Sequence, residues 1–548
     1  MKPLAESTLV DLLDRAVSAH PEGLAVVDRG RRYSYRELDC LVEEFASGLD
    51  SLGVRPGDRV ALWMVNRAEW LVAYFAVARL GAILVGVNTR YTAKELEHVL
   101  ASSGASVLIT QDEFRSYRYI DTLGVLCPEL ALAEPGAWRA ERLPGLREVV
   151  VTGSAVPAGA RPFEGVVAAG RRLIESAVKR NPVPIGPDSL VLLLYTSGTT
   201  SSAKGVMLTH RNIVANNVHS GEHQRLGPRD RMLMAMPLFT PFSCVHALIA
   251  TLGHMGTMVL LDSFSPSACM RLIEEEGCTA MFGVDAVFRD LLDAPDRGAY
   301  DLGSMRTGVG VLSMDTAGRI YNELGFKEYH QGWGMTENGA VATITSISDP
   351  VDMRMRSVGS PVPGMELKLA DPATGRRAED GEVGEILLRG AYITQGYWND
   401  PEATASLIDA DGWLHSGDLG VIAPGGYLLY KGRFKDVIKS SGFNFAPLEV
   451  EEVICALRGV RAAAVVGVPD ERAGEVGYAF VVRDGTEGAT LDQETVRSHC
   501  ASELAKYKVP RIVEFIEGDL PRNDMKKVLK NQLRSRALLA LHERTTGE

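Results

Sequence analysis

Strand and helix patterns alternate along roughly the first 350 residues of the chain. The apolar runs at 58–66 (DRVALWMVN) and 105–110 (ASVLIT) predict strands, and 68–82 (AEWLVAYFAVARLGA) between them has the length and apolar spacing of a helix. Strand, helix and strand in repetition predict a parallel α/β sheet whose strands are buried on both faces. Further strands are expected at 149–153, 190–196, 231–237 and 257–262.

The pattern changes after about residue 350. Residues 358–375 and 384–399 are rich in glycine, proline and period-two alternation, which predicts a small β-barrel or meander. A basic, glycine-containing break follows at 431–447 (KGRFKDVIKSSGFNFAP), and beyond it lie helix and strand patterns of a compact α+β module. We therefore expect two domains, residues 1–433 and residues 434–548.

Composition narrows the class of protein. The chain has 548 residues and a formal net charge of −12 at pH 7, which disfavours nucleic acid as a partner because phosphate binding needs a basic face. The N-terminal segment predicts an amphipathic helix and not a signal peptide, and no uncharged run reaches the ~18 residues of a membrane span. The seven cysteines have no CxxC spacing and are expected to be buried thiols. Together these features predict a cytoplasmic enzyme that does not bind a membrane.

A hydroxyl- and glycine-rich loop follows the strand pattern at 190–196. The stretch LLLYTSGTTSSAKGVMLTHRN (192–212) has the composition of a phosphate-binding loop, because glycine lets the backbone N–H groups approach an anion. It lacks the order G-x-x-x-x-G-K-[ST] of the Walker loop, which excludes that class. A turn without a ligand stays an alternative when the loop is considered alone.

Four later motifs indicate which kind of phosphate-containing ligand the chain binds. YHQGWGMTENG (329–339) offers a flat aromatic side chain for a nucleobase and a carboxylate for Mg²⁺. DGWLHSGDLG (411–420) presents Asp418 in a turn, the segment at 432–452 adds Arg433, and LPRNDMKKVLKNQLR (520–534) contains paired lysines. In this order and spacing, the motifs resemble those of the adenylate-forming superfamily, which contains acyl-CoA synthetases, peptide-synthetase adenylation domains and firefly luciferase. The resemblance extends from about residue 10 to residue 535.

The resemblance implies an α/β fold, with a large N-terminal domain of two α/β subdomains plus a β-barrel and a small mobile α+β lid. It implies ATP, Mg²⁺ and coenzyme A, and a reaction that converts a carboxylic acid to an acyl-adenylate and then to a CoA thioester. The implied catalytic residues are Lys527, Lys204, Thr199 and Glu337, of which Glu337 would also bind Mg²⁺. The implied nucleotide and CoA positions are Thr196, Ser197, Gly198 and Thr200 in the phosphate loop, Trp333 against the adenine, Thr336 near the α-phosphate, Asp418 and Arg433 at the ribose, Lys435 at the hinge, and Ser440, Ser441 and Gly442 beside the pantetheine. Gly334 and Lys439 are further implied cofactor-binding positions.

Several positions depart from the family pattern. The phosphate loop lacks the usual Gly-x-Pro before Lys204, Thr240 stands where CoA ligases usually have histidine, and Lys526 replaces the glycine before Lys527. These departures suggest an alternative, in which the protein transfers a preformed acyl-adenylate to CoA with little adenylation of its own. A luciferase-like oxygenase and a non-catalytic adenylate-binding protein stay open as other classes.

The sequence predicts only the chemical class of the carboxylic acid substrate. The segments that line the acyl pocket in the family are apolar and glycine-rich here, which favours a bulky or aromatic acyl group. No aspartate stands in the stretch 239–243 to hold an α-amino group, so an amino acid substrate is disfavoured. Whether the chain forms a homodimer stays open. The expected pocket residues are Phe239, Thr240, Val284, Gly308, Gly310, Gly332 and Gly339.

Overall fold

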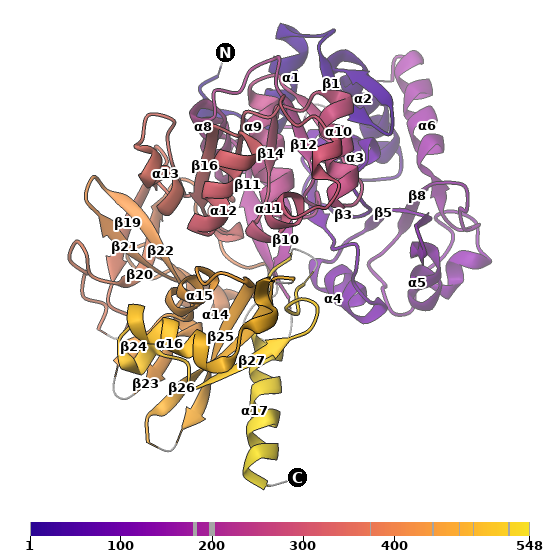
Figure 1. Ribbon diagram of the computed structural model, residues 1–548. Helices are drawn as coiled ribbons and strands as arrows, with labels where there is room; N and C mark the ends of the chain where they lie inside the picture. Colours follow the sequence, from indigo (N-terminus) through magenta and orange to yellow (C-terminus); the bar gives the residue numbers. More distant parts are fainter. Residues whose placement is uncertain are drawn as a thin grey trace.

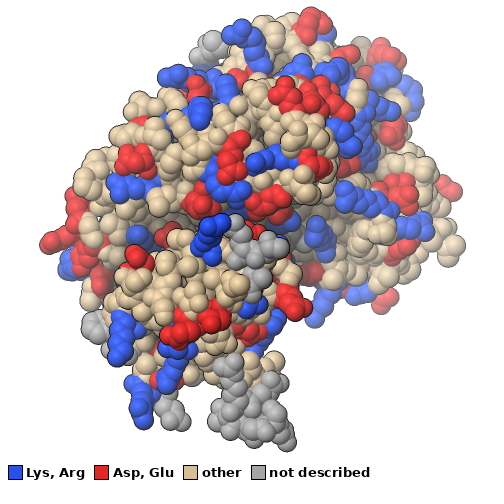
Figure 2. Space-filling model, in the orientation of Figure 1, with Lys and Arg blue, Asp and Glu red and all other residues tan. Residues whose placement is uncertain are grey.

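The computed structural model describes most of the chain. The described residues are 2–178, 183–196, 203–372, 374–440, 443–470, 472–485, 487–523 and 526–546. Figure 1 shows a large α/β body with a smaller domain below it, from which the C-terminal helix α17 (Lys530–Thr546) projects away from the body. On the face seen in Figure 2, basic and acidic side chains are interspersed rather than gathered by sign.

Two sheets form the body. In the first, β10, β4, β3, β5, β8 and β9 run parallel, and β11 pairs antiparallel with β10 at one edge. All four residues of β4 are buried, as expected for a parallel strand covered on both faces. The bounds, in sheet order, are β11 (Lys204–Thr209), β10 (Leu190–Thr196), β4 (Ile83–Gly86), β3 (Arg59–Trp63), β5 (Val107–Gln111), β8 (Glu148–Thr152) and β9 (Arg161–Pro162).

The second sheet has nine strands among the residues that the structure describes. Its centre, from β16 to β1, is parallel, and both edges are antiparallel. In order, the strands are β18 (Ser360–Pro361), β17 (Thr343–Ile344), β16 (Glu328–Trp333), β15 (Thr307–Gly310), β14 (Ala280–Phe282), β12 (Arg231–Met234), β13 (Thr257–Leu260), β1 (Leu24–Asp28) and β2 (Arg31–Ser34).

Helices fill the space between the two sheets and cover their outer faces. The largest core joins strand residues of both sheets to α1 (Leu9–Ala19), α2 (Tyr35–Ser51), α3 (Ala68–Arg79), α8 (Ala215–His223) and α9 (Leu248–Gly253). Successive strand residues point to opposite faces, so Leu108 packs outward while Val107 and Ile109 enter this core. The outer helices are α4 (Ala93–Ser103) and α5 (Tyr119–Leu126) on the first sheet, and α10 (Pro266–Glu276) and α11 (Asp285–Leu292) on the second.

Local sequence signals set the helix ends. Ser34 caps α2 by accepting from the backbone N–H of Glu37, whose carboxylate accepts from the Ser34 N–H in return. The remaining helices of the body are α6 (Phe163–Glu175), α7 (His210–Ile213), α12 (Met314–Arg319), α13 (Val351–Arg356) and α14 (Pro401–Leu407), and a short hairpin is formed by β6 (Glu113–Phe114) and β7 (Tyr117–Arg118).

The predicted barrel or meander is an antiparallel meander of four strands in sequence order. These are β19 (Met365–Ala370), β20 (Gly384–Gly390), β21 (Leu414–Ala423) and β22 (Tyr427–Arg433). Its two end strands do not pair with each other in the described part of the chain, so the sheet is open there.

The C-terminal domain has a sheet of its own, which begins directly after β22. The order is β24-β23-β26-β25, with β27 parallel to β26. Cores lie on both faces, one with α17 and the other with α15 and α16. The bounds are β23 (Ile438–Ser440), β24 (Phe443–Phe445), α15 (Pro447–Cys455), β25 (Val460–Asp470), β26 (Gly474–Arg483), α16 (Gln493–Glu503) and β27 (Ile512–Ile516).

One prediction about cysteine is wrong. Cys40 is exposed and Cys455 is half-buried, whereas the other five thiols are buried. Cys40 lies on α2 but outside the apolar stripe of Leu38, Val42 and Phe45 that faces the core. Separately, among the described residues no helix combines the length and apolarity that crossing a membrane would require.

Candidate functional site

Three predicted nucleotide residues meet at the body's second sheet and the meander. Trp333 ends β16, and its indole Nε1 donates to Asp418 Oδ2 at 3.0 Å. Asp418 on β21 and Arg433 on β22 are paired residues of an antiparallel ladder, with Arg433 Nε 3.4 Å from Asp418 Oδ1. Trp333 and Asp418 are both buried. Segments almost a hundred residues apart thus place an aromatic face, a carboxylate and a guanidinium together.

Lys527 of the C-terminal domain faces the same cluster. Desolvation lowers the pKa of its amine to about 8, as do the charges of Arg433 and Lys435, while Asp418 and Asp436 oppose the shift. Lys527 is nevertheless an exposed residue, so its amine is accessible to a ligand from solvent. In Figure 2 the surface is indented where the two domains meet.

The pKa of the Asp418 carboxyl group is shifted by burial and by its neighbours Arg433, Trp333 and Lys527. Burial raises its pKa, and the charge of Arg433, the hydrogen bond from Trp333 and the charge of Lys527 each lower it. The cluster therefore contains a carboxylate that needs cationic partners when it is ionised. Ribose hydroxyls are suitable donors to such a group.

Glu337 lies on the short helix Thr336–Asn338, which follows β16 and its last residue Trp333. Tyr397 Oη donates to Glu337 Oε1 at 2.9 Å, and the Thr394 N–H donates to the Glu337 carbonyl at 2.7 Å. Burial raises the pKa of Glu337, whereas Tyr397 and Arg433 lower it. A buried carboxylate of this kind fits Mg²⁺, which is held in proteins by one or two carboxylates together with substrate phosphates. The described residues contain no group of three or more His, Cys, Asp or Glu side chains placed to hold a metal.

Lys204 begins β11 beside the same tyrosine. Its Nζ lies 5.3 Å from the centre of the Tyr397 ring and 3.8 Å from Asp400 Oδ2. Thr196, the last residue of β10, pairs with Lys204 across the ladder, so the two ends of the predicted phosphate loop lie together. Four loop residues that the sequence assigns to phosphate, Ser197, Gly198, Thr199 and Thr200, lie outside the described residues.

The predicted hinge and CoA positions lie on the C-terminal side. Lys435 belongs to the short helix Phe434–Asp436 and is exposed. Lys439 and Ser440 are on β23, where Lys439 is exposed and Ser440 is buried. Ser441 and Gly442 lie outside the described residues. The structure brings Lys435 near Lys527, while the roles of all five residues in CoA binding or lid movement stay predictions.

The glycines of the predicted acyl pocket have close neighbours. A Cβ on Gly310 would lie 2.1 Å from Tyr329 Oη, and one on Gly308 would lie 2.0 Å from the Met281 carbonyl oxygen. Gly339 has φ +68° and accepts hydrogen bonds at its carbonyl from Asn216 and Asn217. Gly332 and Gly334 are likewise crowded by backbone of the following segment. These glycines therefore admit close backbone and side-chain packing, and their part in acyl binding stays a prediction.

Of the remaining pocket positions, Phe239 and Thr240 precede a π-helical turn, Pro241–Ala247, and Val284 directly precedes α11. Thr240 is buried and donates through Oγ1 to the Pro237 carbonyl at 2.7 Å, while Phe239 and Val284 are half-buried. His246 lies within this turn and was not singled out from the sequence. It is buried with its ring 4.6 Å from that of Phe282 and its Nε2 2.6 Å from Ser220 Oγ. It lies six residues after Thr240, and this proximity in the sequence was the available signal.

Tyr397 is the main site residue that sequence reasoning missed. It lies in the stretch AYITQGYWND, whose only visible signal is strand-like alternation around glycine. Its contact with Glu337 spans 60 residues and depends on the bridge that pairs Tyr397 with Val206 of β11. No local pattern encodes such a pairing.

The chain is similar to known proteins over nearly its whole length. Residues 13–398 match the family described as AMP-binding enzyme, and residues 449–527 match its C-terminal domain. The chain is 34% identical over 98% of its length to the putative acyl-CoA synthetase YngI of Bacillus subtilis, of which it covers 98%. It is 36% identical over 96% of its length to 3-[(3aS,4S,7aS)-7a-methyl-1,5-dioxo-octahydro-1H-inden-4-yl]propanoyl:CoA ligase of Rhodococcus jostii, covering 98% of that protein. A crystal structure of the anthranilate CoA ligase AuaEII with anthranoyl-AMP superposes with a TM-score of 0.85 at 26% identity, over 99% of each chain.

Proposed function

Because the chain belongs to the AMP-binding enzyme family, we propose that it is an AMP-forming acyl-CoA ligase that converts a carboxylic acid, through its acyl-adenylate, to the CoA thioester. The observation that supports this function most directly is the meeting of Trp333, Asp418 and Arg433 with Lys527 from the other domain. A planar aromatic, a ribose acceptor and a mobile cation are the groups that adenylation requires.

In the first step, the acid's carboxylate oxygen attacks the α-phosphorus of ATP and pyrophosphate leaves. Trp333 would stack on the adenine, and Asp418 would accept hydrogen bonds from the ribose hydroxyls. Lys527 and Lys204 would donate to the phosphoryl oxygens, where negative charge increases in the transition state. Bound Mg²⁺ would neutralise phosphate charge, and Glu337 is the residue that would hold it.

In the second step, the CoA thiol attacks the acyl carbon and AMP leaves. We propose that the domain of residues 434–548 then turns about a hinge near Lys435. This movement would withdraw Lys527 and bring Lys439, Ser440, Ser441 and Gly442 to the pantetheine. Such a lid completes the site separately for each step and excludes water from the adenylate.

The proposed acid is bulky and ring-containing. The aromatic and aliphatic side chains Phe239, Phe242 and Val284 near the expected pocket support an apolar acyl group. Two similar proteins, an indenyl propanoate:CoA ligase and an anthranilate CoA ligase, are likewise named for ring-bearing acids. A cytoplasmic location is part of the proposal, and a homodimer stays open within it.

The alternative, an enzyme that only transfers a preformed acyl-adenylate to CoA, is not favoured. The full-length relatives are named as synthetases and ligases, and their identity to this chain covers both domains. The departures at Thr240 and Lys526 are therefore read as variation within a working ligase.

The test is pyrophosphate release from Mg-ATP with CoA over a panel of aliphatic, aromatic and polycyclic acids. We expect at least one ring-containing acid to release pyrophosphate and to yield its CoA thioester. Lys527→Ala is the matched control, and it should lower release by ~10²–10³ while ATP still binds. Thioester formed only from a supplied acyl-adenylate, with no acid responding, would instead establish the transfer activity.

A further inference from the structure

The residue before Lys527 has an unusual backbone conformation. Lys526 has φ +60°, in the left-handed region that is strained for a residue with a Cβ. Its N–H donates to the Asn523 carbonyl at 2.8 Å, and its own carbonyl accepts from Arg522 Nη1 at 2.9 Å. The Lys527 N–H donates to Asn523 Oδ1 at 2.9 Å. The turn thus keeps the shape that a glycine would give, although a lysine occupies the position.

The Lys526 side chain crosses to the body. Its Nζ donates to Asp290 Oδ2 at 2.9 Å, across 236 residues of sequence, and lies 6.0 Å from the centre of the Phe264 ring. Asp290 is on α11, the outer helix of the second sheet. The next residue, Lys527, faces Asp418 and Arg433 instead. Of two consecutive lysines of the lid, Lys526 therefore pairs with α11, while Lys527 lies within the electrostatic influence of Asp418 and Arg433.

A second contact from α11 reaches the lid beside the first. Arg289 Nη1 donates to the Arg461 carbonyl on β25 at 2.8 Å. Within the body, Arg289 is held by Asp285 at 2.7 Å and by the hydroxyl of Thr316 at 3.0 Å. An arginine fixed on its own domain in this way presents a defined donor to the lid.

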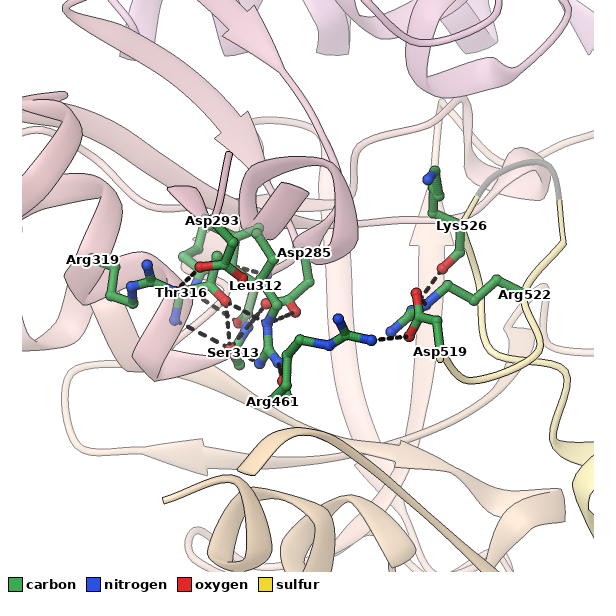
Figure 3. A network of polar contacts seen from close by, with 12 residues as sticks. Asp285, Asp293, Leu312, Ser313, Thr316, Arg319, Arg461, Asp519, Arg522 and Lys526 are labelled. Atoms are coloured by element: carbon green, nitrogen blue, oxygen red, sulfur yellow. Dashed lines mark hydrogen bonds and ion pairs between the residues drawn. The ribbon is translucent and has the colours of Figure 1, made fainter. Parts of the chain in front are cut away.

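Within the lid, the two contacts are connected. Arg461 Nη2 lies 4.0 Å from Asp519 Oδ1, Arg522 Nε lies 3.6 Å from Asp519 Oδ2, and Arg522 also donates to the Lys526 carbonyl. In Figure 3 the Arg461 side chain lies between the body residues around Ser313 and the lid residue Asp519. Polar contacts therefore run from α11 through the lid to Lys526, which returns to α11 at Asp290.

We propose that Lys526 is a positioning residue whose ion pair with Asp290 holds the lid where Lys527 reaches the nucleotide, and so favours adenylation over thioester formation. The inference rests on the proposed function, because only a two-step ligase needs the lid to leave this position for its second step. The pair is partly exposed, with about 42% of the Lys526 side chain and 35% of the Asp290 side chain accessible. A pair of this kind shifts an equilibrium by a factor of up to about five, which suits a contact that must also break.

The test separates the two half-reactions in single-turnover experiments. Asp290→Asn keeps the shape of the side chain and leaves the turn at Lys526 untouched. We expect it to slow pyrophosphate release about two- to fivefold, and to leave thioester formation from supplied acyl-adenylate unchanged or faster. Lys526→Arg should retain the wild-type ratio of the two rates. Salt near 1 M should slow adenylation by wild type more than by Asp290→Asn, because it screens the pair.

Asp293→Asn is the matched control. Asp293 follows α11 and pairs with Arg319 at 2.9 Å within the body, so this variant loses an ion pair that does not reach the lid. We expect both half-reactions to keep their wild-type rates. Equal slowing of both half-reactions by Asp290→Asn, or no change in either, would overturn the positioning role.

A distance measurement decides the inference independently of catalysis. Spin labels at Glu275→Cys on α10 and Ser498→Cys on α16, both exposed positions, report the distance between body and lid in a Cys40→Ser background. Asp290→Asn should broaden this distance distribution and Asp293→Asn should not. If the wild-type enzyme makes no thioester, the proposed function is wrong. The distance measurement still tests the contact in that case. An unbroadened distance distribution in Asp290→Asn would show that the Lys526–Asp290 pair does not restrain the lid.

Discussion

The indole of Trp333 donates to the carboxylate of Asp418 at 3.0 Å, with both groups buried. The aromatic side chain proposed to stack on adenine is therefore also a hydrogen-bond partner of the carboxylate proposed to hold the ribose. Phenylalanine has no ring N–H with which to do this. The nucleoside side of the site thus depends on the orientation of one indole as well as on its flat face.

We predict that Trp333→Phe raises the KM for ATP by about tenfold. The substitution keeps an aromatic face but removes the donor to Asp418, and hydrogen bonds to charged groups are worth about 1.5–3 kcal/mol. Steady-state kinetics with ATP varied is the measurement. Trp138→Phe is the control, because Trp138 donates to the Gly159 carbonyl at 2.9 Å away from the predicted site residues. An unchanged KM for ATP in Trp333→Phe would contradict this role.

We predict that adenylation weakens as pH rises through about 8. The pKa of Lys527 is lowered to about 8, so in the free enzyme its positive charge is present below that pH and is lost above it. The kcat/KM for ATP should therefore fall above pH 8, whereas kcat should fall at higher pH because bound phosphate raises the pKa of the amine. In Lys527→Arg the remaining activity should show no such fall, since arginine stays protonated. A wild-type profile flat to pH 10 would contradict the prediction.

We predict that Tyr397→Phe increases the Mg²⁺ concentration needed for half-maximal rate by about tenfold. The Tyr397 hydroxyl stabilises the ionised Glu337, whose pKa burial already raises, so its loss favours the protonated acid. A Mg²⁺ titration of pyrophosphate release at fixed ATP measures this. Tyr392→Phe should behave as wild type, because that hydroxyl donates to the Pro363 carbonyl instead. Equal Mg²⁺ dependence in the two variants would show that Tyr397 has no part in holding the metal.

We predict that Gly339→Ala destabilises the protein by more than about 2 kcal/mol, as measured by chemical denaturation. Gly339 has φ +68°, and a Cβ there would lie 1.9 Å from the Asn212 carbonyl oxygen, so the substitution adds a clash to the backbone strain. Gly325→Ala is the control, because Gly325 has φ +76° with open space around the added methyl group. The control should lose only the unfolding free energy that the backbone strain costs, about 1–2 kcal/mol. Equal losses in the two variants would mean that the backbone near Asn212 moves aside.

The sequence by itself determined the alternation of strands and helices and most of the candidate site. Parallel strands buried on both faces are continuous apolar runs, so segments such as β10 and β12 are visible without neighbours. The motifs around Trp333, Asp418 and Lys527 are visible because each is a short stretch whose residue types suit nucleotide chemistry. Those features are local, and local composition is what a single sequence displays.

Only the tertiary structure decided how these segments meet. Tyr397 reaches Glu337, and Lys526 reaches Asp290 across 236 residues, through sheet pairing and domain packing that leave no periodic pattern in the sequence. The exposure of Cys40 likewise depends on which face of α2 meets the core. Contacts between distant segments depend on the packing of whole sheets and helices, which no short stretch of residues encodes.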